Sequence, residues 1–151
     1  MGRIAATLAL TTALAAPAAA RPASVEHLFR EFGLFGAWAA NCGEAASPDN
    51  PRVTVAMPEP GRVVERHDFG PGYETNRYVI LSARRIAAGR LGIEARFEQG
   101  DADPEQQRII LRVEGRERRT LFNVPSGEEP RVIEGIAIVS GLPTPTLTKC
   151  E

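Results

Sequence analysis

The sequence predicts an all-β protein: a single antiparallel eight-stranded meander or barrel, preceded by one short N-terminal helix. Three observations favour this class. Apolar and polar residues alternate with a period of two through most of the chain after residue 50, short turns rich in glycine and proline separate the alternating runs, and no second helical pattern is long enough for a parallel crossover. Because every connection is short, successive strands should pair antiparallel.

The first twenty residues have the pattern of a secretory signal peptide. Arg3 provides a positive start, an apolar run follows from residue 4 to about residue 16, and Ala18 and Ala20 form an Ala-x-Ala cleavage site. The apolar run is shorter than the roughly 20 residues that cross a bilayer, and Pro17 interrupts it, which favours cleavage over anchoring. The predicted organisation is a signal peptide (1–20), a short helix (21–33) and a β-barrel domain (34–151).

Size and charge narrow the possible functions. Removing residues 1–20 removes one basic residue, Arg3, so the net charge changes only from −1 to −2. A nearly neutral domain gives no electrostatic reason to expect nucleic acid or an anionic membrane surface as a partner. A chain of this length can bury a single core without a metal or cofactor, and we expect none.

The two cysteines, Cys42 and Cys150, stand near opposite ends of the mature chain. In an oxidising compartment they can form a disulfide that closes a loop of about a hundred residues. No CxxC spacing exists and neither cysteine has a histidine nearby in sequence, which argues against a metal-binding or reactive thiol pair. We therefore predict a structural disulfide in a periplasmic or secreted protein.

Each element has a local basis in the sequence. Ser24 suits the N-cap of a helix over residues 24–32, apolar residues recur there at helical spacing, and Gly33 is placed to end it. The eight expected strands lie at about 35–40, 52–57, 63–69, 74–86, 90–98, 108–113, 116–124 and 131–139. The tail after residue 140 should run extended over the surface and bring Cys150 back to Cys42.

Eight strands are enough to close an up-and-down barrel whose interior is either filled or holds one small ligand. A two-layer sandwich stays open as an alternative, because strands such as 78–80 and 109–111 carry apolar residues on both faces.

The segment Phe35-Gly36-Ala37-Trp38 follows the helix and opens the first strand. It resembles the Gly-x-Trp start of the lipocalin-like (calycin-type) barrels, and this resemblance implies that Gly36 and Trp38 lie at the closed base, beneath a ligand cavity. Trp38 can equally be a core aromatic whose indole N–H donates to a carbonyl. The overall pattern also resembles small exported proteins of alphaproteobacteria, a resemblance that implies no activity.

Candidate catalytic residues are few. His67 lies between Arg66 and Asp68, but adjacent residues on a strand point to opposite faces, so His67 and Asp68 should not meet. Gly70-Pro-Gly72 lacks the lysine and helix of a phosphate-binding loop, and no serine lies in a Gly-x-Ser-x-Gly elbow.

The basic residues between 112 and 119, in the sixth and seventh expected strands, are interleaved with acidic ones. Arg112, Arg116, Arg118 and Arg119 are accompanied by glutamates, so we expect a solvated, ion-paired sheet face.

These observations favour a monomeric, non-enzymatic barrel that binds a small apolar or amphipathic ligand. The alternative is an inhibitor or envelope-interaction module that contacts a protein through loops such as 70–73 or 125–130. A small hydrolase using His67 is the third hypothesis.

Overall fold

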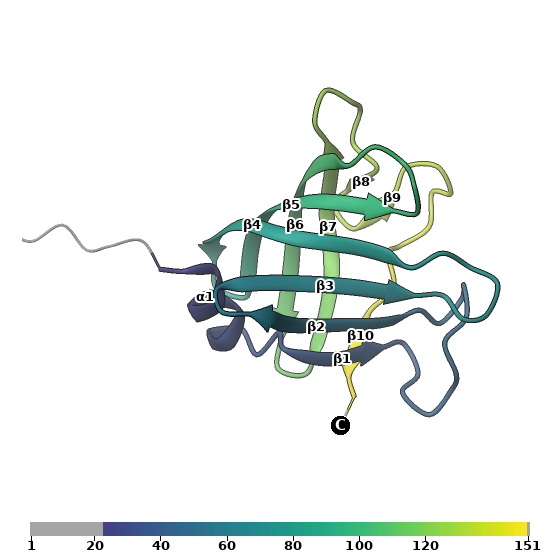
Figure 1. Ribbon diagram of the computed structural model, residues 1–151, viewed down its shortest axis with the longest axis horizontal. Coiled ribbons are helices and arrows are strands. Elements are labelled where there is room, and N and C mark those ends of the chain that lie inside the picture. Colours follow the sequence, from purple (N-terminus) through teal and green to yellow (C-terminus); the bar gives the residue numbers. More distant parts are fainter. Residues whose placement is uncertain (1–22, 151) are drawn as a thin grey trace, which may run out of the picture.

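The computed structural model describes residues 23–150, and Figure 1 shows them as one antiparallel sheet curled into a barrel, with a single helix at one end. The predicted signal peptide lies outside the described residues and stays a prediction. No helix within residues 23–150 is long and apolar enough to span a membrane.

The helix α1 (Val25–Glu31) is capped as the sequence predicts. The Ser24 side chain accepts a hydrogen bond from the His27 backbone N–H (3.1 Å), and Gly33 ends the turn at φ 64°. Leu28 and Phe29 are buried, and Arg85 in the sheet pairs with Glu31 while its guanidinium lies over the Phe32 ring. These contacts hold α1 against one end of the barrel.

Ten strands follow α1, joined by turns and loops. They are β1 (Gly36–Ala39), β2 (Arg52–Glu59), β3 (Arg62–Asp68), β4 (Asn76–Ala87), β5 (Arg90–Gln99), β6 (Glu105–Glu114), β7 (Glu117–Pro125), β8 (Val132–Ile133), β9 (Ile136–Ala137) and β10 (Leu147–Lys149).

The sheet closes through β10. This strand pairs with β1 on one side, opposing Lys149 to Trp38, and with β7 on the other, opposing Leu147 to Arg118. The ring therefore contains β1 to β7 and β10, which is the predicted closed eight-stranded antiparallel barrel rather than a sandwich.

The prediction of the last strand is wrong. Residues 131–139 were expected to form one strand, but they fold back at Glu134 and Gly135 into the two-residue strands β8 and β9. Both turn residues have positive φ (50° and 76°), the conformation of a tight hairpin turn. The eighth barrel strand comes instead from the tail, which was expected to lie over the surface.

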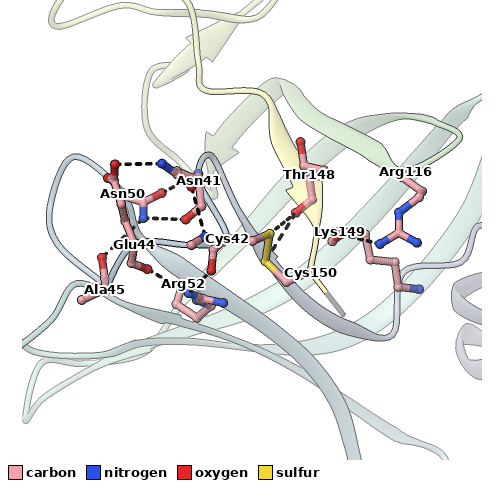
Figure 2. The surroundings of a disulfide bond; sticks show 11 residues. Asn41, Cys42, Glu44, Ala45, Asn50, Arg52, Arg116, Thr148, Lys149 and Cys150 are labelled. Carbon is pink, nitrogen blue, oxygen red and sulfur yellow. Dashed lines mark hydrogen bonds between the residues drawn. A yellow bond between two sulfur atoms is a disulfide. The ribbon is translucent and has the colours of Figure 1, made fainter.

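The disulfide confirms the prediction for Cys42 and Cys150. Their Cα atoms are 5.5 Å apart across 108 residues of sequence, and the Cys150 backbone N–H donates to the Ala37 carbonyl oxygen (2.8 Å). Figure 2 shows the bond beside β10, where the Arg116 guanidinium also donates to the Lys149 carbonyl oxygen (2.9 Å). The bond thus fastens the short closing strand.

The loop before β2 is also held beside this disulfide. The Asn50 amide accepts from the Asn41 backbone N–H (2.9 Å) and donates to the Asn41 carbonyl oxygen (3.0 Å), while Arg52 donates to the carbonyl oxygen of Cys42 (Figure 2). Cys42 is therefore positioned by its own loop as well as by Cys150.

The apolar core fills the end of the barrel that carries α1. Trp38 is fully buried there, and its indole Nε1–H donates to the Leu34 carbonyl oxygen (2.8 Å). Phe29 from α1 and Leu91 from β5 belong to the same cluster and are also fully buried. The polar side chains of the interior therefore lie in the other half of the barrel.

Candidate functional site: a cavity inside the barrel

A cavity of about 270 Å³ lies inside the barrel, and none of its lining residues comes from α1. Its lining comes from β2 to β8 and from the tail at 144–147. The volume is slightly below the roughly 300–1,000 Å³ typical of drug-sized ligands. It exceeds the roughly 150 Å³ of an engineered apolar cavity that takes up benzene. A compact molecule therefore fits.

Aliphatic side chains line much of the cavity wall, and they come from strands on all sides of the barrel. The apolar lining residues are Val53, Ile80, Ile93, Ile109, Leu111, Val132 and Leu147, together with Pro51 and Pro145.

A buried ion pair between Glu65 of β3 and Arg118 of β7 forms the floor of the polar part of the cavity. The Arg118 guanidinium donates to both carboxylate oxygens, at 2.6 Å to Oε1 and 2.9 Å to Oε2. This two-point geometry is the strong form of an arginine–carboxylate contact. The arginine side chain is only 4% exposed and also lies over the Trp38 ring.

The ion pair spans the bore of the barrel. In the closed ring, β3 and β7 are separated by three strands in either direction, so they lie on opposite sides. A contact between their interior side chains must therefore cross the interior. Arg118, which lines the cavity, lies over the Trp38 ring on its other side.

The pair sets the charge state of Glu65. Burial alone would raise the pKa of its carboxyl, but the charge of Arg118 and the hydrogen bond from His67 outweigh burial and hold the pKa far below its ordinary value of 4.5. Glu65 is therefore ionised at neutral pH. Since each of its oxygens is already bonded to Arg118, it is poorly placed to act as a free base.

His67 and Tyr78 continue the polar wall above this pair. The His67 Nε2 lies 2.7 Å from Glu65 Oε1, and because that carboxylate only accepts, Nε2 carries the proton. The ring centroids of His67 and Tyr78 are 5.0 Å apart, and those of Tyr78 and Phe97 are 4.9 Å apart. Burial, and then the charge of Glu65, raise the pKa of the Tyr78 hydroxyl, which stays protonated as a donor.

A chain of side-chain hydrogen bonds forms the rim over β6, β7 and β8. Asn123 Nδ2 donates to Gln107 Oε1 (2.7 Å), and Gln107 donates in turn to Glu105. Arg131 donates to both oxygens of Glu105 and to Glu128, so its charge is neutralised at the rim.

The tail segment that completes the wall is held by Arg119. This residue follows the buried Arg118 on β7 and also lines the cavity. Its Nε donates to Thr144 Oγ1 (3.1 Å) and its terminal nitrogen to the Gly135 carbonyl oxygen (2.6 Å). This arginine ties β7 to the hairpin β8–β9 and to the tail.

The structure separates His67 from Asp68, as strand alternation predicts: Asp68 instead accepts from the Gly70 backbone N–H (2.8 Å). The carboxylate that His67 meets is Glu65, two residues earlier on the same face. The assignment of Arg118 to a solvated face is wrong, because this side chain is buried. The sequence contained one signal for an interior polar site. Glu65 and His67 lie two and four residues after Val63 on the same strand, so these two ionisable residues share the face of an apolar residue that is buried.

Gly36 and Trp38 lie at the start of β1, at the end of the barrel where α1 packs. Gly36 has φ 114°, a value that side chains rarely allow, and a Cβ there would contact the Lys149 side chain. Lys149 Nζ donates to the Gly33 carbonyl oxygen (2.7 Å) and lies over the Trp38 ring. The two residues are therefore part of the joint between α1, β1 and β10.

The cavity combines aliphatic side chains, the Glu65–Arg118 ion pair, two further arginines (Arg119 and Arg131) and a few neutral polar groups. Within residues 23–150 no group of three or more histidine, cysteine, aspartate or glutamate side chains could hold a metal ion. This arrangement can enclose a small molecule and hydrogen-bond one end of it. Comparison with known proteins assigns no family: no family model, curated protein or solved structure matches the chain.

Proposed function

We propose that this protein is an exported, monomeric, non-enzymatic binding protein that takes up a small amphipathic ligand in its barrel cavity. The observation that carries the proposal is the 270 Å³ cavity, which has aliphatic side chains on one part of its wall and Tyr78, His67 and Asn123 on another. An eight-stranded barrel with an internal cavity beyond a buried tryptophan is the arrangement implied by the lipocalin-like resemblance.

The disulfide supports export, because such bonds persist in oxidising compartments. The proposal that the protein is not an enzyme rests on Glu65. Its two oxygens are bonded to Arg118, so the His67–Glu65 contact belongs to an ion-paired network rather than to a base beside a nucleophile. We therefore expect the wild-type protein to have no hydrolytic activity, so His67→Ala should change nothing in a hydrolase assay.

Uptake of toluene, followed by chemical-shift titration of backbone amides, tests the cavity. We expect wild-type shifts to concentrate on β3, β4 and β6. Ile109→Phe places extra volume in the cavity and should abolish uptake. Ile110→Phe is the matched control, because it adds the same volume to the opposite face of β6. Equal toluene binding by both variants, or none by the wild type, would reject the proposal.

A second candidate function is an inhibitor or envelope-interaction module. The specific observation that favours it is a group of exposed apolar side chains within residues 133–142, where Val139 is 99% exposed and Leu142 is 64% exposed. These residues lie next to the predicted contact loop 125–130, and Tyr73 in the other predicted loop is 60% exposed. Stoichiometric capture of one envelope protein by the wild type, lost in Val139→Ser/Leu142→Ser, would support this function.

A further inference from the structure

We infer that the cavity selects an uncharged ligand whose polar end both donates and accepts a hydrogen bond, such as an alcohol or a primary amide attached to a compact apolar body. The inference rests on the proposed binding function and specifies the ligand class of the same cavity.

The charged side chains of the lining are already held by other groups of the protein. Arg118 is neutralised by Glu65, and Arg131 by Glu105 and Glu128. Arg119 also lines the cavity, and its guanidinium donates to neutral oxygens of the hairpin and the tail. A charged ligand would therefore lose its hydration in a largely aliphatic space whose buried ion pair is already satisfied and whose Arg119 is engaged by the hairpin and the tail.

One polar group of the lining has no hydrogen-bond partner in the part of the chain that the structure describes. Buried tyrosine hydroxyls normally find a partner, yet within residues 23–150 the Tyr78 hydroxyl has none, although it lines the cavity and remains protonated. It is therefore a donor that a ligand can satisfy.

The matching acceptor is the imidazole of His67, which lines the cavity. Because the Nε2–H of His67 donates to Glu65, an imidazole that carries a single proton presents Nδ1 as an acceptor. Asn76 opposes His67 across β3 and β4, and its buried Oδ1 has no hydrogen-bond partner in the described part of the chain, but Asn76 is not among the residues that line the cavity.

A donor at Tyr78 beside an acceptor at His67 is complementary to a hydroxyl or a primary amide, which can accept from the first and donate to the second. A carboxylate cannot donate and an ammonium cannot accept. These polar groups lie on β3 and β4, next to the ion pair, so the polar end of the ligand is expected toward these two strands and its apolar body against the aliphatic residues of the remaining wall.

Five probes built on one benzene ring test the ligand class by the same chemical-shift titration at pH 8, above the range in which imidazole side chains normally protonate. They are toluene, benzyl alcohol, benzamide, benzoate and benzylammonium. We expect benzyl alcohol and benzamide to bind about tenfold more tightly than toluene, as two net hydrogen bonds allow, and the two ions to bind more weakly than toluene.

Variants of the two tyrosines test whether the Tyr78 hydroxyl causes the preference for benzyl alcohol over toluene. Tyr78→Phe should weaken benzyl alcohol binding by about three- to tenfold and leave toluene binding unchanged. The control Tyr73→Phe alters an exposed tyrosine and should change neither.

Tightest binding by benzoate or benzylammonium, or an unchanged preference for benzyl alcohol in Tyr78→Phe, would overturn the inferred ligand class while leaving the binding function intact. Failure of all five probes to bind would overturn both proposals.

Discussion

At the scale of single residues, the unusual feature is a charge pair inside the bore of a small barrel. An ion pair taken out of water loses hydration that its mutual attraction only partly returns, so it is weak evidence for stability. Glu65 and Arg118 nevertheless satisfy one another through two hydrogen bonds, and His67 adds a third. The intact pair therefore lowers the stability of the fold little, whereas loss of one partner lowers it strongly.

Removing only one partner should be strongly destabilising. Arg118→Met leaves the Glu65 carboxylate buried without its counter-charge, and we expect the free energy of unfolding to fall by about 3–5 kcal/mol. Urea denaturation followed by Trp38 fluorescence measures it. Arg112→Met, which removes an exposed arginine paired with Glu114, should cost less than about 1 kcal/mol. Similar losses in both variants would contradict this account of the pair.

The double variant Glu65→Leu/Arg118→Met removes both charges together. It should recover most of the stability lost in Arg118→Met, because apolar residues of similar volume can replace a buried pair.

The lowered pKa of Glu65 predicts a specific acid sensitivity. Since the folded protein holds the carboxyl below its ordinary pKa of 4.5, ionisation contributes stability that is fully present above about pH 4.5 and is lost as the pH falls further toward the folded value. Wild-type stability should therefore fall more steeply below pH 4.5 than that of Glu65→Gln, which has no proton to take up. Parallel stability curves for the two proteins between pH 5 and pH 2 would show that Glu65 does not carry this dependence.

At the scale of elements, closure depends on the three-residue strand β10. Its pairings with β1 and β7 are short, and a strand of this length would fray without a further constraint. The disulfide at Cys150 and the Arg116–Lys149 contact supply that constraint (Figure 2). The covalent bond therefore completes the barrel, beyond joining the two ends of the chain.

Removing the disulfide should loosen the barrel at this seam. The chain-entropy model assigns a closed loop of about a hundred residues on the order of 4–5 kcal/mol, so Cys42→Ser/Cys150→Ser should lose about that much free energy of unfolding. Amide hydrogen exchange should rise first in β10 and in its partner β1. Uniform exchange across all strands, with no excess at β10, would show that the seam is held by other contacts.

At the scale of the whole molecule, one continuous core joins α1 to the barrel. Leu28 and Phe29 of the helix pack in the same cluster as Trp38 and the inward residues of β2 to β6. Such an arrangement favours unfolding as a single unit.

Urea unfolding monitored by Trp38 fluorescence and by circular dichroism should accordingly give coincident transitions. Trp38 is the only tryptophan, so its signal reports the α1 end of the barrel, while circular dichroism reports all strands. Separate midpoints would mean that the cavity half of the barrel unfolds independently of the α1 end.

Local patterns were enough to predict the helix cap at Ser24 and the antiparallel strands up to β7, because capping, alternation and turn chemistry act over a few residues. The pairing of the two cysteines followed from their number and from the expected oxidising compartment. Local patterns misassigned residues 131–139, where an apolar run concealed a turn at Glu134-Gly135, and they missed that the tail supplies the closing strand. Strand pairing over such distances depends on long-range geometry that no local pattern contains.

The sequence by itself determined the class of fold and the strands that build it, because the period of two and the turn residues are local properties. Only the tertiary structure decided what lies inside. Closure of the ring brings β3 against β7 across the bore, so Glu65 and Arg118, 53 residues apart, form one ion pair and define a cavity above it. Alternation specifies which face a residue occupies, whereas its partner across the interior depends on how the sheet curves and where it closes.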